Sequence, residues 1–332
     1  MRKFVFNLLK TLAYLGLSYV MFVCALVFTG DGYLQNIVDA RGGVGHSLVR
    51  FSEAENVSDV DVCFIGSSHA YRGFDTRFFD KEGLSAVNLG SPIQTPFNTY
   101  FVLNEYLEKV NPKVVVIETY WNMLVNDGTE SAIDLISNIG FTSNMLEMAW
   151  EKKRDIRFLN SAFLGWLKYS FFDVAQKDIP HDIYISGGFV MSDTIANLPG
   201  FERKILSSKW DVHPVQMEYL GKILDLCQSK NIRVMLVSAP VTRELYHSVQ
   251  KDYEAKYYNP IHDLAVRYGI PFWDYNYSED VKLDALTHFF DTNHLTQAGV
   301  ELFNQHFISR FKREVYEVDL MAETVEEEVN IL

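Results

Sequence analysis

Short apolar runs alternate with longer amphipathic stretches along most of the chain. The apolar runs are Val62–Gly66, Ala86–Gly90, Lys113–Thr119, Arg233–Ala239 and Pro271–Tyr275. Runs of this length, several of them ending in turn residues, are typical of buried strands. Five buried strands separated by helices predict a parallel sheet that is covered on both faces. We therefore expect the α/β fold class, as a three-layer α/β/α sandwich around a five-stranded parallel sheet.

Several stretches between and after these runs carry apolar residues at helical spacing. They are Pro96–Val110, Pro214–Lys230 and Gln297–Phe311. Residues 126–211, between the third and fourth runs, form a long aromatic-rich insertion with a turn at Gly187 and Gly188. We expect mainly helical packing there. The other interpretation is that the insertion roofs a substrate site at the carboxyl ends of the strands.

The N-terminus has the pattern of a signal anchor. Arg2, Lys3 and Lys10 precede an uncharged stretch from Thr11 to Thr29. At ~1.5 Å per residue this stretch is long enough to cross most of the ~30 Å hydrocarbon core of a bilayer. Basic residues before the span place the N-terminus in the cytoplasm and the rest of the chain outside. We expect a single-pass protein of the cell membrane with an extracytoplasmic domain.

Two kinds of processing compete with a retained anchor. Cleavage by a signal peptidase is disfavoured because residues 27–30 form a poor small-x-small site. Cys24 suggests a lipoprotein, but Val23 before it is larger than the residue that such processing requires. We therefore expect the anchor to stay attached, with Cys24 as an apolar residue that faces lipid.

Composition divides the chain into four parts. Residues 1–30 form the anchor, and the glycine-bearing residues 31–58 suit a juxtamembrane connector. Residues 59–315 form the folded domain, which contains the insertion at 126–211. Residues 316–332 carry acidic side chains and no basic ones, so we expect a solvated acidic tail.

Length, charge and cysteine usage narrow the class of protein. The 332 residues suit one large domain with appendages, and hydrophobic residues make up 48% of them, enough for a substantial core. The formal net charge of −13 makes a nucleic-acid backbone a poor partner. Outside the anchor the cysteines are Cys63 and Cys227. We expect packed thiols there and no disulfide framework.

Two polar motifs at opposite ends of the domain carry candidate chemistry. Ser68 follows the first apolar run on a turn into a helix, where unpaired backbone N–H groups can bind a developing oxyanion. Asp291 and His294 lie three residues apart, shortly before the last predicted helix. A histidine at this spacing can present one ring nitrogen to the serine while the aspartate orients the other. The pattern indicates acyl transfer through a split Ser–His–Asp triad.

A metal site is the competing interpretation of the same region. His288, Asp291 and His294 have suitable ligand types, and His69 could join them. No strong zinc motif such as His-Glu-x-x-His occurs in the sequence. We therefore expect no metal, and we assign His288 and His69 to polar packing around the site.

In order and spacing these motifs resemble those of the SGNH (GDSL-type) hydrolases, over roughly residues 60–312. The likeness is to the membrane-anchored branch, which contains teichoic-acid D-alanyl-transfer proteins and alginate-type O-acetyltransferases. The resemblance implies a flavodoxin-like fold without a cofactor. It also implies Ser68 as nucleophile, His294 as general base and Asp291 as the partner that orients His294. Ser67 stands where the family has the aspartate of its Gly-Asp-Ser block.

The resemblance also implies an oxyanion hole. Its expected donors are the backbone N–H groups of Ser68 and Gly90, together with a side chain from the family's third block. That block is Gly-x-Asn-Asp in the family, whereas residues 118–122 read Glu-Thr-Tyr-Trp-Asn. Either Tyr120 or Asn122 therefore supplies the third donor.

Together these features predict a membrane-anchored serine esterase or O-acyltransferase. Water as acceptor makes an esterase and a sugar hydroxyl makes a transferase, and the sequence leaves both open. The expected substrate is an acylated glycan or another ester, in cell-envelope or exported polysaccharide. Transfer also requires a polytopic acyl-export membrane partner, because a single span cannot deliver an acyl donor.

The alternative is a non-catalytic SGNH-shaped scaffold or glycan-binding subunit. The presence of Ser68, Asp291 and His294 counts against it.

Overall fold

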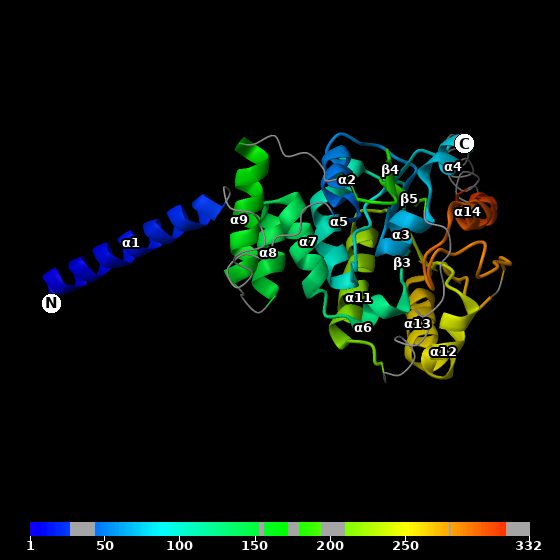
Figure 1. Cartoon of the computed structure of the whole chain (residues 1–332). Helices are drawn as coiled ribbons and strands as arrows, with labels where there is room; N and C mark the ends of the chain where they lie inside the picture. The colour runs from blue at the N-terminus through cyan, green and yellow to red at the C-terminus, as the bar shows by residue number, and fades with distance from the viewer. Residues whose placement is uncertain (27–43, 153–155, 172–178, 194–209, 279, 317–332) are drawn as a thin grey trace, which may run out of the picture.

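A long helix and a large α/β body make up the molecule (Figure 1). The computed structural model describes residues 1–26, 44–152, 156–171, 179–193, 210–278 and 280–316. Helix α1 (Arg2–Ala25) projects from one end of the body. Within the described residues it is the one helix that is long and apolar enough to cross a membrane.

The body is built on a five-stranded sheet, as predicted. Its strands are β1 (Val62–Ile65), β2 (Ala86–Asn88), β3 (Val114–Glu118), β6 (Arg233–Ser238) and β7 (Phe272–Asp274). They are all parallel and lie in the order β2-β1-β3-β6-β7. Each strand ends one or two residues before the predicted run does, because the last residues of each run turn out of the sheet at its carboxyl edge.

Alternate residues of each strand enter two separate hydrophobic cores. In β1, Cys63 and Ile65 belong to the core on one face, whereas Val62 and Phe64 belong to the core on the other. All four side chains are buried. Burial on both faces explains why the strands read as continuous apolar runs and not as alternating polar and apolar positions.

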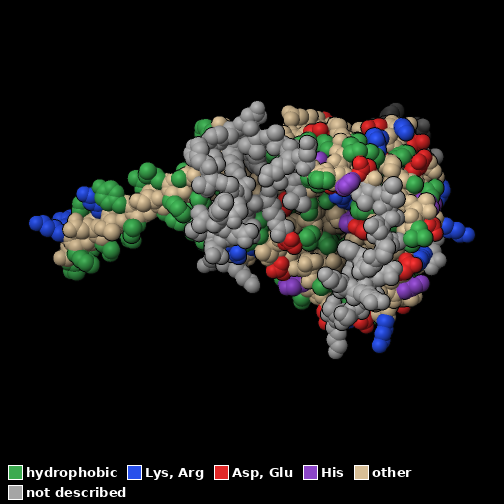
Figure 2. Space-filling view, in the orientation of Figure 1, with side chains coloured by type: hydrophobic (Ala, Val, Ile, Leu, Met, Phe, Trp, Pro, Cys, Tyr) green, Lys and Arg blue, Asp and Glu red, His purple; other side chains and the backbone are tan. Residues whose placement is uncertain are grey.

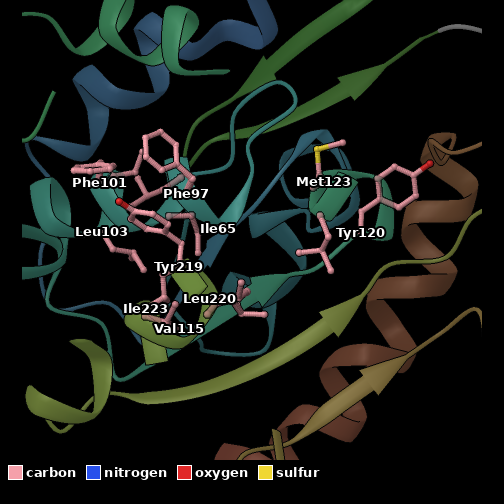
Figure 3. Packing of buried hydrophobic residues seen from close by; sticks show 14 of the residues in the cluster. Ile65, Phe97, Phe101, Leu103, Val115, Tyr120, Met123, Tyr219, Leu220 and Ile223 are labelled. Atoms are coloured by element: carbon pink, nitrogen blue, oxygen red, sulfur yellow. The ribbon is translucent and has the colours of Figure 1, made fainter. Parts of the chain in front are cut away.

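Helices cover both faces of the sheet, which makes the three-layer sandwich. Helices α5 (Pro96–Val110) and α11 (Pro214–Ser229) pack against each other over the first core. Figure 3 shows side chains of this core, with Phe97, Phe101 and Tyr219 grouped between the helices and the sheet. Helices α4 (Thr76–Lys81) and α14 (Gln297–Phe311) cover the second core. The three predicted helices and the fold class are confirmed.

The insertion contains helices and one hairpin. Its helices are α6 (Trp121–Val125), α7 (Thr129–Ile139), α8 (Ser143–Glu151) and α9 (Ile156–Phe171). Strands β4 (Asp182–Ile185) and β5 (Phe189–Ser192) form an antiparallel hairpin around the predicted Gly187–Gly188 turn. The helices α7 and α9 pack against each other toward the α1 end of the body, whereas the hairpin contacts α3 (Ser68–Gly73).

The packed body begins well before residue 60. After the 3₁₀ turn η2 (Val44–His46), helix α2 (Ser47–Ala54) buries Phe51 and Ala54 in the first core. The second half of the predicted connector is therefore part of the domain. Its first half and the acidic tail beyond Tyr316 lie outside the described residues.

The remaining helices complete the carboxyl-terminal part of the body. They are α12 (Arg243–Tyr253), the π-helix η3 (Glu254–Tyr258), α13 (Asn259–Tyr268) and the π-helix η4 (Lys312–Tyr316). Cys63 and Cys227 are free, buried thiols, as predicted. Burial raises the pKa of both thiols, that of Cys227 to about 12, so neither is a reactive nucleophile.

Candidate active site

The turn between β1 and α3 presents Ser68 at the carboxyl edge of the sheet. Gly66 has φ +148°, and a Cβ there would lie 2.8 Å from the Glu118 backbone oxygen, so the close approach of β1 and β3 requires glycine. Ser67 caps α3, its Oγ accepting a hydrogen bond from the His69 N–H at 3.2 Å. Ser68 is then the first helical residue, and its side chain stays half-buried.

His294 and Asp291 reach Ser68 from the loop before α14. The Nε2 atom of His294 lies 2.8 Å from the Ser68 Oγ, and its Nδ1 lies 2.7 Å from Asp291 Oδ2. The other carboxylate oxygen of Asp291 accepts hydrogen bonds from the backbone N–H groups of Asn293 and His294, at 2.9 and 2.7 Å. The three predicted residues therefore form one continuous hydrogen-bonded chain across 226 residues of sequence.

The surroundings of Asp291 hold this carboxylate in its charged form. Burial alone would raise its pKa, but the His294 ring and the two backbone N–H groups outweigh burial and lower the pKa below its usual value. An ionised Asp291 accepts the Nδ1 proton of His294. This fixes the tautomer in which Nε2 can accept the Ser68 proton.

His69 lies beside the triad and takes no part in it. Its ring is buried and stacks on Tyr120, with ring centroids 3.9 Å apart. Its Nε2 lies 3.1 Å from the Asn293 amide nitrogen. Burial and the nearby His294 lower the pKa of His69 well below its usual value, so this ring is neutral and accepts the amide proton. The structure thus places His69 in polar packing around the site.

Glu118 is a buried neighbour of Ser67 that the sequence did not single out. It ends β3, and its Oε2 accepts a hydrogen bond from the Ser67 hydroxyl at 3.0 Å. Burial raises its pKa to about 8, although the hydrogen bonds from Ser67 and from the Tyr120 backbone oppose this shift. The Glu118 carboxyl group therefore lies beneath the turn that carries Ser67 and Ser68. The available signal was one ionisable residue at the end of an otherwise apolar strand.

The predicted oxyanion donors are in different states. Ser68, as the first residue of α3, has a backbone N–H without an intrahelical acceptor. The Gly90 N–H donates to the Asn88 side chain at 3.0 Å, so it is engaged in this structure. Tyr120 is buried against His69, and Asn122 is half-buried in α6. Figure 3 shows the Tyr120 ring directed away from the other labelled side chains.

The residues of the competing metal interpretation do not converge. His288 uses its Nδ1 to accept a hydrogen bond from the Asp284 N–H at 2.8 Å. His294 uses both ring nitrogens within the triad. Over the described ranges, no group of three or more histidine, cysteine, aspartate or glutamate residues is arranged to hold a metal ion.

Comparisons with known proteins give one family match and weak structural likenesses. Residues 195–311 match a family described as "Protein of unknown function (DUF1574)". No curated protein matches the chain. A GDSL-like lipase from Bacteroides thetaiotaomicron aligns with a TM-score of 0.42 and 14% identity, over 82% of this chain and 99% of the lipase. A putative acylhydrolase from Bacteroides fragilis aligns with the same TM-score and identity, over 80% of this chain and 96% of its own.

The first of these proteins is described as GDSL-like, and GDSL-type hydrolases are the family that the sequence motifs resemble. At 14% identity both likenesses concern the fold alone.

Proposed function

We propose that the chain is a membrane-anchored serine ester hydrolase or acyltransferase of the SGNH type, with Ser68 as its nucleophile. The observation that carries this proposal is the unbroken series of hydrogen bonds from Ser68 through His294 to Asp291. A serine hydroxyl is a weak nucleophile until a base at hydrogen-bonding distance accepts its proton. His294 meets that requirement at 2.8 Å.

The reaction then has two halves. In the first, His294 Nε2 accepts the Ser68 proton while Ser68 Oγ attacks the ester carbonyl, and the resulting tetrahedral intermediate expels the alcohol, which takes that proton from His294. In the second, water or a sugar hydroxyl gives its proton to His294 and attacks the acyl-enzyme. Ser68 Oγ leaves with the proton that His294 returns. Asp291 stays ionised and stabilises the imidazolium in both halves.

Some of the expected oxyanion-hole donors support the proposal that Ser68 is the nucleophile. The Ser68 N–H is held in place at the start of α3, where the positive end of the helix dipole lies. The Gly90 N–H contributes if the substrate oxygen replaces or shares its bond to Asn88. Tyr120 or Asn122 supplies the remaining donor.

We propose that α1 spans the cell membrane and that the body lies outside the cytoplasm. Arg2 and Lys3 at one end of α1 support this orientation. The substrate is then an acylated glycan of the envelope or an exported polysaccharide, or another ester. Transfer to a glycan would draw its acyl group from a polytopic acyl-export partner.

The test uses the full-length chain in detergent micelles with p-nitrophenyl acetate, followed by acetylated and unacetylated oligosaccharides. We expect release of p-nitrophenol that depends on Ser68 and His294. New acetyl groups on the unacetylated oligosaccharide identify a transferase. Release of acetate without such transfer identifies an esterase. A matched control is Ser309→Ala, an exposed serine of α14. A folded protein that turns over none of these esters would favour the scaffold or glycan-binding alternative.

A further inference from the structure

Helix α9 turns an apolar stripe outward. Side chains at helical spacing on this face are exposed or half-buried. They are Ile156, Phe163, Trp166 and Leu167, and the half-buried Leu159 lies at the edge where this face meets the core. Ile156 is 53% exposed and Trp166 is 40% exposed. The opposite side of α9, which includes Phe158 and Ala162, packs into the body. A helix on the surface of a water-exposed domain normally has polar side chains on its outer face.

Aromatic contacts extend this stripe into a patch. Phe163 stacks on Trp166 with ring centroids 5.8 Å apart, and Phe141 meets Phe163 edge-on at 6.2 Å. Phe171, at the end of α9, contacts Trp166 at 5.8 Å. Phe141 and Phe171 are 45% and 68% exposed. A contiguous patch of large apolar side chains on a protein surface marks a contact with a membrane or another apolar partner.

The patch lies next to the end of the candidate membrane span. The Asn160 side chain of α9 donates a hydrogen bond to the Tyr19 hydroxyl of α1 at 2.7 Å. Val23 of α1 is 1% exposed, so the last turns of α1 are packed against the body. Figure 1 shows α1 meeting α9 crosswise. Figure 2 shows hydrophobic side chains along α1, with Lys and Arg side chains gathered at the end far from the body.

We propose that α9 lies along the surface of the membrane that α1 spans, with its apolar stripe in the interface between headgroups and acyl chains. The proposal rests on the proposed membrane attachment through α1. A helix that crosses a spanning helix at a steep angle runs roughly parallel to the bilayer plane. Tryptophan is enriched at this depth because its ring is amphipathic, and tryptophan, phenylalanine and leucine form the buried face of helices that lie in the interface. The lipid bilayer, as the occupant continuous with α1, covers the stripe.

The test places a spin label on the stripe in the full-length chain. Ser170 is exposed on the same face of α9, seven residues after Phe163, and Ser170→Cys changes one atom. The matched control is Ser309→Cys, exposed on α14 at the opposite end of the body. Both carry Cys24→Ser, and the buried thiols Cys63 and Cys227 do not react. The labelled proteins are reconstituted in vesicles of phosphatidylcholine and phosphatidylglycerol.

Collisions with oxygen and with a water-soluble nickel chelate then report depth. We expect the label at Ser170 to be several-fold more accessible to oxygen relative to nickel than the label at Ser309. This ratio should not change when the protein is diluted tenfold in lipid. Equal ratios at the two sites would overturn the proposal, and so would a Ser170 value that falls on dilution, which would indicate a second copy of the chain as occupant. Co-flotation with vesicles scores attachment through α1 separately.

Discussion

The carboxyl edge of the sheet and the outer face of α9 differ in what they expose and in what holds them. At the sheet edge, half-buried polar groups are held by hydrogen bonds, such as Ser68 to His294 at 2.8 Å. On α9, large apolar side chains such as Trp166 are turned outward. A proton relay needs rigid and partly desolvated partners, whereas a membrane contact needs apolar area that is free to meet lipid. The proposed chemistry and the proposed membrane contact therefore lie in separate parts of the chain, and substitutions in one should leave the other unchanged.

The largest expected effect comes from breaking the relay. Ser68→Ala and His294→Ala should each lower kcat/KM for p-nitrophenyl acetate by at least about 10³-fold, because either change removes activation of the hydroxyl. The double variant should lose little more. The free energy of unfolding of each variant, measured with denaturant, should stay within about 1 kcal/mol of the wild-type value, because both side chains are only half-buried. Losses that multiply in the double variant would contradict a single catalytic unit.

Asp291→Asn should have the next largest effect on kcat. An amide at this position no longer demands the Nδ1 proton of His294, so the ring can adopt the tautomer that cannot accept the Ser68 proton. We expect a loss of about 10²- to 10⁴-fold in kcat with a smaller change in KM. Asp284→Asn, exposed in the preceding loop, is the control. Equal kinetics for the two variants would remove Asp291 from the triad.

Glu118→Gln should change how stability depends on pH. The pKa of Glu118 is about 8 in the folded protein, above that of an exposed glutamate (~4.3), so the folded state binds this proton more tightly. Folding stability contributed by this group is therefore complete at low pH and decreases as pH rises from about 4.5 to 8. From pH 5 to pH 8, the free energy of unfolding of the wild type should decrease by ~2–5 kcal/mol more than that of Glu118→Gln. Parallel pH profiles would show that Glu118 is ionised in the folded state.

The smallest effect on chemistry is expected from the α9 stripe. Trp166→Ser removes an exposed ring, so ester hydrolysis in micelles should change less than about twofold. In vesicles, the same change should make a label at Ser170 more accessible to the nickel chelate, because the stripe loses apolar area. A parallel loss of activity in micelles would mean that the two regions are coupled and would contradict their separation.

The sheet and the triad were predictable because each leaves a local signal. Buried parallel strands read as apolar runs, and Ser68 lies two residues after the end of one such run. Asp291 and His294 stand three residues apart, a spacing that brings base and orienter together on one turn. Parallel strands then bring both motifs to one edge of the sheet.

Other features depend on contacts that are distant in sequence. Glu118 accepts its hydrogen bond from Ser67, 51 residues away. The ring of His69 stacks on Tyr120 because β1 and β3 are neighbouring strands. The bond from Gly90 to Asn88 depends on a local turn that a strand pattern does not encode. The outward stripe of α9 reads as ordinary core spacing until packing shows that it faces away from the body.

The most direct test of the account is the site of covalent labelling by a fluorophosphonate probe. The probe forms a bond from phosphorus to an activated serine oxygen and releases fluoride, so it reports the nucleophile without any assumption about the natural substrate. The full-length wild type should be labelled once, and peptide mapping should place the label on Ser68, with none on Ser68→Ala or His294→Ala. Absence of labelling in the folded wild type, or a label on Ser67 or another serine, would contradict the assignment of Ser68.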